Sequence, residues 1–304
     1  MTTTEPPSTP PTPTRILPRA LLPCLLLLAS AARTQAPATT PASPWRLVWS
    51  DEFNAPNGSS PDPTKWSFDL GGNGYGNHEL ETYTSRPANA QQKDGNLVIT
   101  ALKEDATGPD DGTPRHYTSA RIRTAGHFAQ AYGRFEARMQ LPRGKGIWPA
   151  FWLLGDDIAS TGWPKSGEID IMEEIGDPST VYSTLHGPGY SGGHAISAKF
   201  PLPPGQAADT AFHLYAVEWA PDDIKFFFDN HLIAHRTPAD LPPGAHWAYD
   251  HPFFIILNLA VGGDWPGNPD ATTTFPQHML VDYVRVYTKT AAPAPAPPAP
   301  GKSK

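Results

Sequence analysis

A ten-residue segment in the middle of the chain limits the fold more than any other: Gly167-Glu168-Ile169-Asp170-Ile171-Met172-Glu173-Glu174-Ile175-Gly176. Acidic and apolar residues alternate through its first half. Successive side chains of a strand point to opposite faces, so the pattern predicts a strand with Glu168 and Asp170 on one face and isoleucines on the other. Such a strand needs a sheet that is buried on one side and open on the other.

The segment leaves open which glutamate joins that acidic face. In an unbroken strand Glu174 would follow Asp170, whereas one residue bulging out after Asp170 would place Glu173 there instead. A solvated sheet face is the simpler interpretation. A glycosidase site is the functional one, because it needs one carboxylate as nucleophile or base and a second held protonated as acid. Repulsion between neighbouring carboxylates also perturbs their pKa values in the way that catalysis uses.

The rest of the chain reads as short strands separated by Gly, Pro, Asn and Asp. Residues 132–141 alternate cleanly and predict a half-buried strand. Residues 253–261 are apolar almost throughout, as in a strand covered on both sides, and residues 117–122 predict one more strand. Other strands are expected over residues 45–49, 96–102, 147–154, 181–186, 212–219, 224–229 and 282–287. No long amphipathic helix is predicted, so the fold is expected to be all-β, with two sheets packed as a sandwich.

The ends of the chain differ from its middle. Arg15 and Arg19 precede a short apolar run and then small residues, so residues 1–36 are interpreted as a secretory signal peptide with an N-terminal extension. The apolar run is short for a membrane span, and an uncleaved anchor is the alternative. Residues 37–44 are expected to be a linker, residues 45–288 one domain and residues 289–304 a disordered Pro/Ala-rich tail. The protein is therefore expected to be secreted or periplasmic, with no membrane association after cleavage.

Cysteine and charge exclude several classes of function. Cys24, the one cysteine, lies in the apolar run, and the leucines that follow it argue against lipidation, so the mature chain is expected to have no disulfide. The net charge is −7. Removal of residues 1–36 would leave 20 basic and 29 acidic side chains, a net charge of −9. With no long basic run, nucleic acid is excluded as a partner, and a neutral polymer fits better than an anionic one.

The acidic segment resembles the bulged Glu-x-Asp-x-x-Glu signature of glycoside hydrolase family 16. Other segments agree with that family in order along the chain: Trp49-Ser50-Asp51-Glu52-Phe53, Gly76-Asn77-His78-Glu79-Leu80, Ser119-Ala120-Arg121-Ile122, Trp148-Pro149-Ala150-Phe151-Trp152 and Val281-Asp282-Tyr283-Val284-Arg285. They are most similar to the laminarinase-like branch, which contains endo-acting β-1,3-glucanases. The resemblance implies a concanavalin-like β-jelly-roll sandwich of two antiparallel sheets with a concave substrate cleft.

The resemblance also implies roles for the acidic residues. Glu168 would be the nucleophile, Glu173 the general acid/base and Asp170 the group between them, which leaves Glu174 as a structural residue. A retaining glycosidase needs its two carboxyl groups about 5–5.5 Å apart, and neighbours on one strand face suit that spacing better than the wider inverting geometry does.

Several polar and aromatic residues are expected to bind substrate. A pyranose presents a flat C–H face that the large rigid surface of Trp matches. By resemblance, Asn77 and Arg121 would contact sugar hydroxyls. His186 shares its strand face with Thr184 beside the acidic strand, and a satisfied core histidine is the alternative to a residue that lines the cleft. The expected substrate-binding residues are Asn77, Arg121, Trp148, Trp152, Trp163, His186 and Trp265.

A structural calcium ion is implied by the resemblance alone. Relatives bind it on the convex side through backbone carbonyls and one aspartate, and the matching positions are Glu52, Gly95 and Asp282. These residues supply the oxygen ligands that calcium prefers. The ion would stabilise the fold, and no cofactor is expected for catalysis.

The sequence thus predicts a secreted, monomeric, retaining endo-β-1,3-glucanase that hydrolyses laminarin-like β-1,3-glucans or mixed β-1,3-1,4-glucans. One alternative keeps the chemistry and changes the substrate to another polysaccharide, such as agarose or lichenan. Carrageenan is disfavoured because a sulfated polymer calls for a basic cleft. The other alternative is a non-catalytic glucan-binding module, which would be expected to have lost Glu168 or Glu173.

Overall fold

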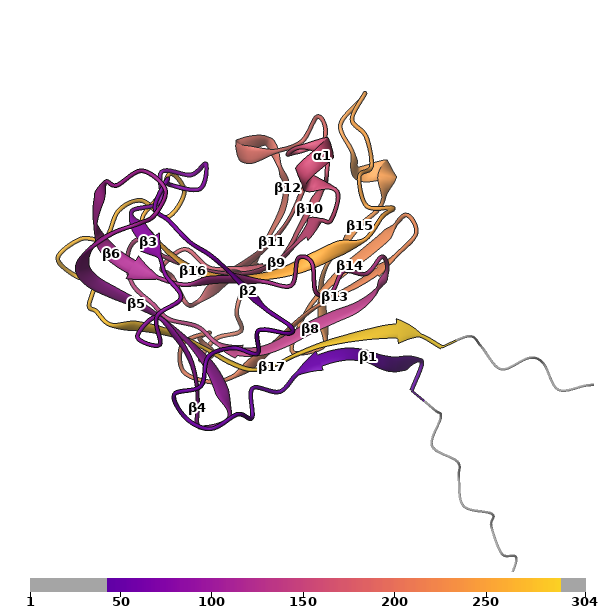
Figure 1. Cartoon of the computed structure of the whole chain (residues 1–304). Helices are drawn as coiled ribbons and strands as arrows, with labels where there is room; N and C mark the ends of the chain where they lie inside the picture. Colours follow the sequence, from indigo (N-terminus) through magenta and orange to yellow (C-terminus); the bar gives the residue numbers. More distant parts are fainter. Residues whose placement is uncertain (1–42, 291–304) are drawn as a thin grey trace, which may run out of the picture. The chain divides into compact units, whose positions relative to one another are not determined.

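Two β-sheets pack face to face in the structure, a computed structural model that describes residues 43–290 (Figure 1). The predicted signal peptide with Cys24, most of the predicted linker and most of the predicted tail lie outside the described residues. Within that range every strand pairing is antiparallel except that of β3 (Glu81–Tyr83) with β6 (Pro114–Ser119), which is parallel. The predicted two-sheet, all-β fold is confirmed.

The larger sheet has ten strands. Their order is β15 (His231–Arg236), β14 (Asp223–Phe228), β13 (His213–Ala220), β8 (Gly133–Gln140), β17 (Gln277–Lys289), β5 (Asn96–Thr107), β6 and β3, with β1 (Trp45–Asp51) beside β17 and β4 (Ala90–Lys93) beside β5.

The smaller sheet has seven strands. Their order is β12 (Ile196–Pro201), β11 (Thr180–His186), β10 (Glu168–Glu173), β9 (Ile147–Gly155), β16 (Phe253–Val261), β7 (Arg121–Arg123) and β2 (Ser67–Asp69). Short helical turns, α1 (Ile158–Thr161), η1 (Gly192–His194) and η2 (Pro238–Asp240), lie in the connections. Among the described residues no helix is long and apolar enough to cross a membrane.

The apolar faces of the two sheets meet in one core. Phe135 and Met139 of β8 point into it from the larger sheet and Phe151 of β9 from the smaller one, and all three are fully buried. Trp219 of β13 packs edge-on against Phe253 of β16, with ring centroids 5.1 Å apart. Each such side chain contributes about 1.5–3 kcal/mol through burial. Every residue of β16 is buried, as the apolar pattern of residues 253–261 predicts.

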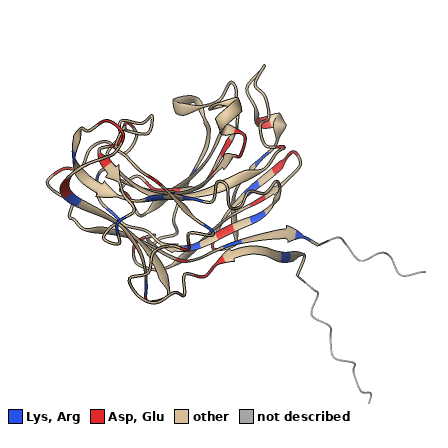
Figure 2. Ribbon diagram, viewed as in Figure 1, with Lys and Arg blue, Asp and Glu red and all other residues tan. Residues whose placement is uncertain are grey.

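The outer face of β8 departs from the predicted half-buried strand. Arg134 and Glu136 on that face are 8% and 7% exposed. Arg134 Nε donates to Glu136 at 2.8 Å and Nη1 to Glu218 at 3.0 Å, and its guanidinium lies over the ring of Phe227. Ion pairing and stacking therefore cover polar residues that the alternation alone assigns to solvent. Figure 2 shows this mixture of blue and red segments on the larger sheet.

The single strand predicted over residues 117–122 is wrong in one respect. β6 ends at Ser119 in the larger sheet and β7 begins at Arg121 in the smaller one. Ala120 between them is fully buried. The chain changes sheets at this small residue, and the change brings Arg121 onto the face that carries the acidic strand. The edge strands β12 and β15 were not predicted, because their patterns are short and mixed.

Candidate active site

A bulge in β10 decides which glutamate faces outward with Glu168. Glu168, Asp170 and Glu173 pair with His186, Thr184 and Tyr182 of β11. The step from Asp170 to Glu173 is three residues, whereas the matching step on β11, from Thr184 to Tyr182, is two. On the other side, the register against β9 shifts between Asp170 and Met172. One extra residue therefore sits in the strand after Asp170, and it turns Glu173 onto the face of Glu168.

Gly167 fixes the start of this strand. Its φ is +69°, a conformation that favours glycine, and a Cβ added there would lie 2.5 Å from the carbonyl oxygen of Ala248. Only a glycine lets the chain enter β10 so close to the neighbouring segment. The position of Glu168 thus depends on the residue that precedes it.

A cleft of about 1320 Å³ lies over the outer face of the smaller sheet. All ten residues predicted for catalysis or substrate binding line it, together with others from the loops around residues 73–79 and 192–197. Glu174 is absent from the lining and is fully buried on the other side of β10. The geometry thus agrees with the bulged alternative and with Glu174 as a structural residue.

The first acidic residue, Glu168, is partly exposed to the cleft. Trp163 Nε1 donates a hydrogen bond to its Oε2 at 2.7 Å. The Trp163 ring is 49% exposed, so its face stays open to a ligand. A carboxylate that accepts an N–H bond is held in one orientation. This arrangement suits a nucleophile.

The middle acid, Asp170, is 2% exposed. Burial raises its pKa well above the ordinary value, and the charge and hydrogen bond of neighbouring Glu168 raise it further. Both effects favour a protonated Asp170 carboxyl beside Glu168.

The third acid, Glu173, is 8% exposed. Burial raises its pKa well above the ordinary value, and the neighbouring Asp170 carboxyl adds to the effect. Trp148 Nε1 donates to Glu173 Oε1 at 3.1 Å and limits the rise. A carboxyl group kept protonated at neutral pH on a cleft face is equipped to act as a general acid.

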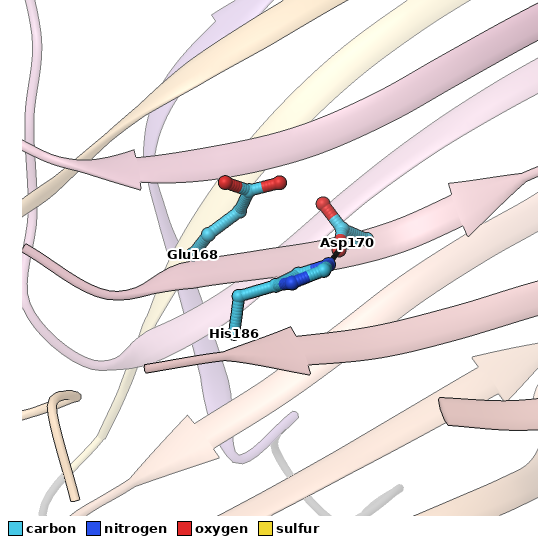
Figure 3. Close-up of side chains that lie close together, drawn as sticks. All are labelled: Glu168, Asp170 and His186. Atoms are coloured by element: carbon cyan, nitrogen blue, oxygen red, sulfur yellow. Dashed lines mark ion pairs between the residues drawn. The ribbon is translucent and has the colours of Figure 1, made fainter. Parts of the chain in front are cut away.

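His186 on β11 lies beside Asp170, and Figure 3 shows it next to the two acids of β10. The backbone N–H of Gly192 donates to its Nδ1 at 3.1 Å, so the ring proton of the neutral histidine lies on Nε2. Nε2 lies 3.1 Å from Oδ2 of Asp170, although without the alignment of a full hydrogen bond. His186 is thus a donor beside the acids and is not a satisfied core histidine.

The same three side chains have the spacing of a metal site. One ligating atom each from Glu168, Asp170 and His186 lies within 4.8 Å of the others. A metal ion would need the lone pair of Nε2, whereas the Gly192 bond places the proton there. The tautomer favours a histidine that donates to Asp170 over one that ligates a cation.

Aromatic residues flank the acids on both sides. Trp148 beside Glu173 packs against Trp265 with centroids 5.8 Å apart, and Tyr182 packs against Trp265 at 4.9 Å. Trp163 occupies the opposite side, beside Glu168. A chain of sugars could therefore lie across the acids with an aromatic surface at each end.

Arg121 lies between two rings. Its guanidinium is 4.8 Å from the centroid of Tyr75 and 4.8 Å from that of Trp152. Arg121 Nε also donates to Asp69 at 2.9 Å, so the charge is paired and the side chain is fixed. The predicted alternative of a simple surface ion pair is therefore incomplete, because the stacked guanidinium also lines the cleft.

Four lining or supporting residues were not singled out from the sequence as site residues: Tyr75, Glu79, Tyr83 and Asn258. Tyr83 OH donates to Glu79 at 2.9 Å and accepts from Asn258 at 3.2 Å. The sequence signal for this region is the glycine-rich segment 71–76 and the polar residues that follow it, Asn77, His78, Glu79, Glu81 and Tyr83. Nothing in the local pattern of residues 253–261 marked Asn258, which is the one polar residue in an apolar strand.

The residues predicted for calcium lie away from this cleft. The Asp282 carboxylate accepts from Arg138 at 2.6 Å, and the two Glu52 oxygens accept from Arg285 at 2.9 and 2.7 Å. Arg138 thus already neutralises Asp282, the one side-chain ligand implied, whereas Glu52 and Gly95 would supply backbone carbonyls. Calcium binding through these residues and Gly95 stays a prediction.

Comparison with known proteins agrees with this geometry. The sequence profile of Glycosyl hydrolases family 16 matches residues 77–285. A beta-glucanase of Rhodothermus marinus is 45% identical over 258 residues, which cover 80% of this chain and 85% of that protein.

Solved structures are similar as well. The laminarinase catalytic domain of Thermotoga maritima has a TM-score of 0.77 and 47% identity, covering 81% of this chain and 99% of that one. The endo-beta-1,3-glucanase of Pyrococcus furiosus has a TM-score of 0.77 and 46% identity, covering 82% and 96%. The fold is therefore the family jelly roll, and the chain belongs to glycosyl hydrolases family 16.

Proposed function

We propose that the protein is an endo-acting β-1,3-glucanase that cleaves with retention of configuration. One observation carries the proposal: the bulge in β10 brings Glu168 and Glu173 onto the same face of one cleft, each fixed by a tryptophan N–H. Their environments differ, since Glu168 is partly exposed and Glu173 is buried with a raised pKa. Two carboxyl groups in opposite protonation states are what double displacement requires.

In this mechanism Glu168 attacks the anomeric carbon while Glu173 gives its proton to the departing glycosidic oxygen. A covalent glycosyl–Glu168 ester results. Glu173, now ionised, takes a proton from water as the water attacks the same carbon, and Glu168 leaves. Asp170 holds the shared proton beside Glu168 and orients that carboxylate. The second displacement restores the original configuration and protonation states.

The substrate class follows from the lining of the cleft. Exposed tryptophan faces and a lining in which acidic residues outnumber the two basic ones, Arg121 and Lys199, suit a neutral sugar polymer better than a sulfated one. The names of the similar proteins, a beta-glucanase, a laminarinase and an endo-beta-1,3-glucanase, support a β-1,3-glucan. Mixed β-1,3-1,4-glucan is the second candidate, since the same aromatic surfaces can contact either linkage.

Export and a monomeric state are part of the proposal. Export is supported by the basic, apolar and small-residue order of residues 1–36, and the monomer by a cleft whose predicted residues all come from one chain. Mass spectrometry of the protein from the culture medium should show a start near residue 33 or 37. Light scattering should give the mass of one chain.

The test compares the wild-type protein with Glu168→Ala and Glu173→Ala on laminarin, lichenan and agarose, with folding checked by circular dichroism. Reducing sugar should form from laminarin with the wild type and fall at least about a thousandfold with either variant. Azide should rescue each variant with opposite product anomers. It replaces the lost nucleophile in Glu168→Ala and intercepts the glycosyl ester in Glu173→Ala.

Substantial laminarin hydrolysis by folded Glu168→Ala protein would show that the nucleophile is misassigned. Binding of laminarin without hydrolysis by the wild type would instead favour the non-catalytic module, which the presence of both glutamates argues against.

A further inference from the structure

A second pair of buried acids lies behind the cleft. Glu79, in the loop before β3, is 6% exposed, and Glu81 at the start of β3 is fully buried. The mechanism above uses neither residue. Buried carboxyl groups are costly unless hydrogen bonds satisfy them, so their partners show what they do.

A chain of hydrogen bonds connects Glu79 to the tryptophan face of the cleft. Trp152 Nε1 donates to Asn258 Oδ1 at 2.8 Å, and Asn258 Nδ2 donates to Tyr83 OH at 3.2 Å. Tyr83 OH in turn donates to Glu79 Oε2 at 2.9 Å. Every donor in this chain points the same way, from the cleft wall toward one carboxylate. The ring of Trp152 is therefore held in place by the Glu79 carboxyl group through three hydrogen bonds.

A second, shorter connection reaches the cleft from the other side of the same carboxylate. Asn77 Nδ2 donates to Glu79 Oε1 at 3.1 Å. This bond orients the Asn77 amide, whose Oδ1 and second N–H can then contact sugar hydroxyls. Asn77 and Trp152 both line the cleft, and Glu79 holds both of them.

Glu81 is the buried acid that interacts with Glu79. The backbone N–H of Val261 donates to Glu81 Oε2 at 2.7 Å. Its Oε1 has no donor beside it within residues 43–290, as expected of a protonated oxygen that donates to Glu79. Burial, and then the charge of Glu79, raise the pKa of Glu81 well above its ordinary value. These effects favour the protonated form of Glu81.

We propose that Glu79 is a positioning residue that orients Trp152 and Asn77 for the sugar bound beside Glu168. The inference rests on the proposed function, because it names the support of one glucan-binding wall. It predicts that loss of Glu79 weakens glucan binding more than it slows the chemical step, since no bond of this network reaches Glu168 or Glu173.

The experiment uses isosteric changes in the full chain. Glu79→Gln replaces one of the two accepting oxygens with an NH₂ group, which then faces a donor. Tyr83→Phe removes the hydrogen bonds that link Glu79 to Asn258. Tyr215→Phe is the matched control, because it removes a buried hydroxyl that has no partner in the described range and does not line the cleft. KM and kcat are measured on laminarin. Binding of a laminari-oligosaccharide is measured by calorimetry in a Glu168→Gln background.

An unsatisfied buried partner costs enough to weaken binding on the order of tenfold. We expect this loss for Glu79→Gln and a several-fold loss for Tyr83→Phe, with kcat within about twofold of the wild type. Tyr215→Phe should bind as the wild type does. Glu81→Gln should lose less affinity than Glu79→Gln, because glutamine imitates a neutral acid that donates to Glu79 and accepts from Val261.

Folded Glu79→Gln protein with unchanged affinity would overturn the proposal, as would a larger loss for Glu81→Gln than for Glu79→Gln. If Glu79→Gln does not fold, the glucan affinities of Tyr83→Phe and Tyr215→Phe are compared instead. Equal affinities would reject the inference. A wild-type protein that neither binds nor cleaves laminarin would instead reject the proposed function.

Discussion

Glu174 offers the sharpest test of the bulge, because it directly follows Glu173 in the chain but is buried away from the cleft. It is fully buried between the sheets. Burial raises its pKa from 4.5 to about 9, and the charge of Asp177 adds to the effect. Glu174→Gln should therefore stabilise the protein at neutral pH and leave catalysis intact.

The magnitude follows from the two pKa values. Between pH 4.5 and about 9 the folded protein keeps a proton on Glu174 that the unfolded chain has released. The free energy of unfolding then falls by about 1.4 kcal/mol for each pH unit, and the contribution of this group is fully present only below pH 4.5. At pH 7 the loss amounts to about 3 kcal/mol. Glutamine has the same shape and no ionisation, so the variant should regain about that amount, a rise of roughly 6–10 °C in Tm.

The assay measures Tm and chemical unfolding of both proteins from pH 4.5 to pH 8, together with laminarin hydrolysis. The stability difference should be small at pH 4.5 and grow with pH, and kcat should stay near the wild-type value. Glu173→Gln is the control that should abolish activity. Loss of activity in folded Glu174→Gln protein would refute the bulge assignment, and equal stabilities at all pH values would refute the buried neutral acid.

Two further predictions concern the acids of the cleft. Trp148→Phe keeps an aromatic ring but removes the N–H that lowers the pKa of Glu173, so the alkaline limb of the pH profile of kcat/KM should move to higher pH. An unmoved limb would contradict Glu173 as the acid. His186→Asn keeps an acceptor for Gly192 but loses the donor beside Asp170, whereas His186→Gln keeps the donor. We expect kcat to fall about tenfold in the first and less in the second, and equal losses would argue against the tautomer assigned here.

Much of the site could be predicted because its central residues share one strand. The alternation of residues 168–171 assigns Glu168 and Asp170 to one face and the isoleucines to the other, and the structure has this arrangement. The choice between Glu173 and Glu174 could not be made from the pattern alone, since a bulge depends on the neighbouring strands. The family resemblance favoured Glu173, and the register against β9 and β11 places it in the cleft.

The sequence by itself determined the fold class, the acidic strand and the family, because period-two alternation and short motifs are local properties of the chain. Only the tertiary structure decided what supports the cleft. Asn258 and Tyr83 lie 175 residues apart in sequence and yet join Trp152 to Glu79. The change of sheet at Ala120 and the covered face of β8 also depend on distant residues. A hydrogen bond or a stacked ring needs its partner within a few ångströms, and the local sequence pattern does not indicate which distant residue supplies that partner.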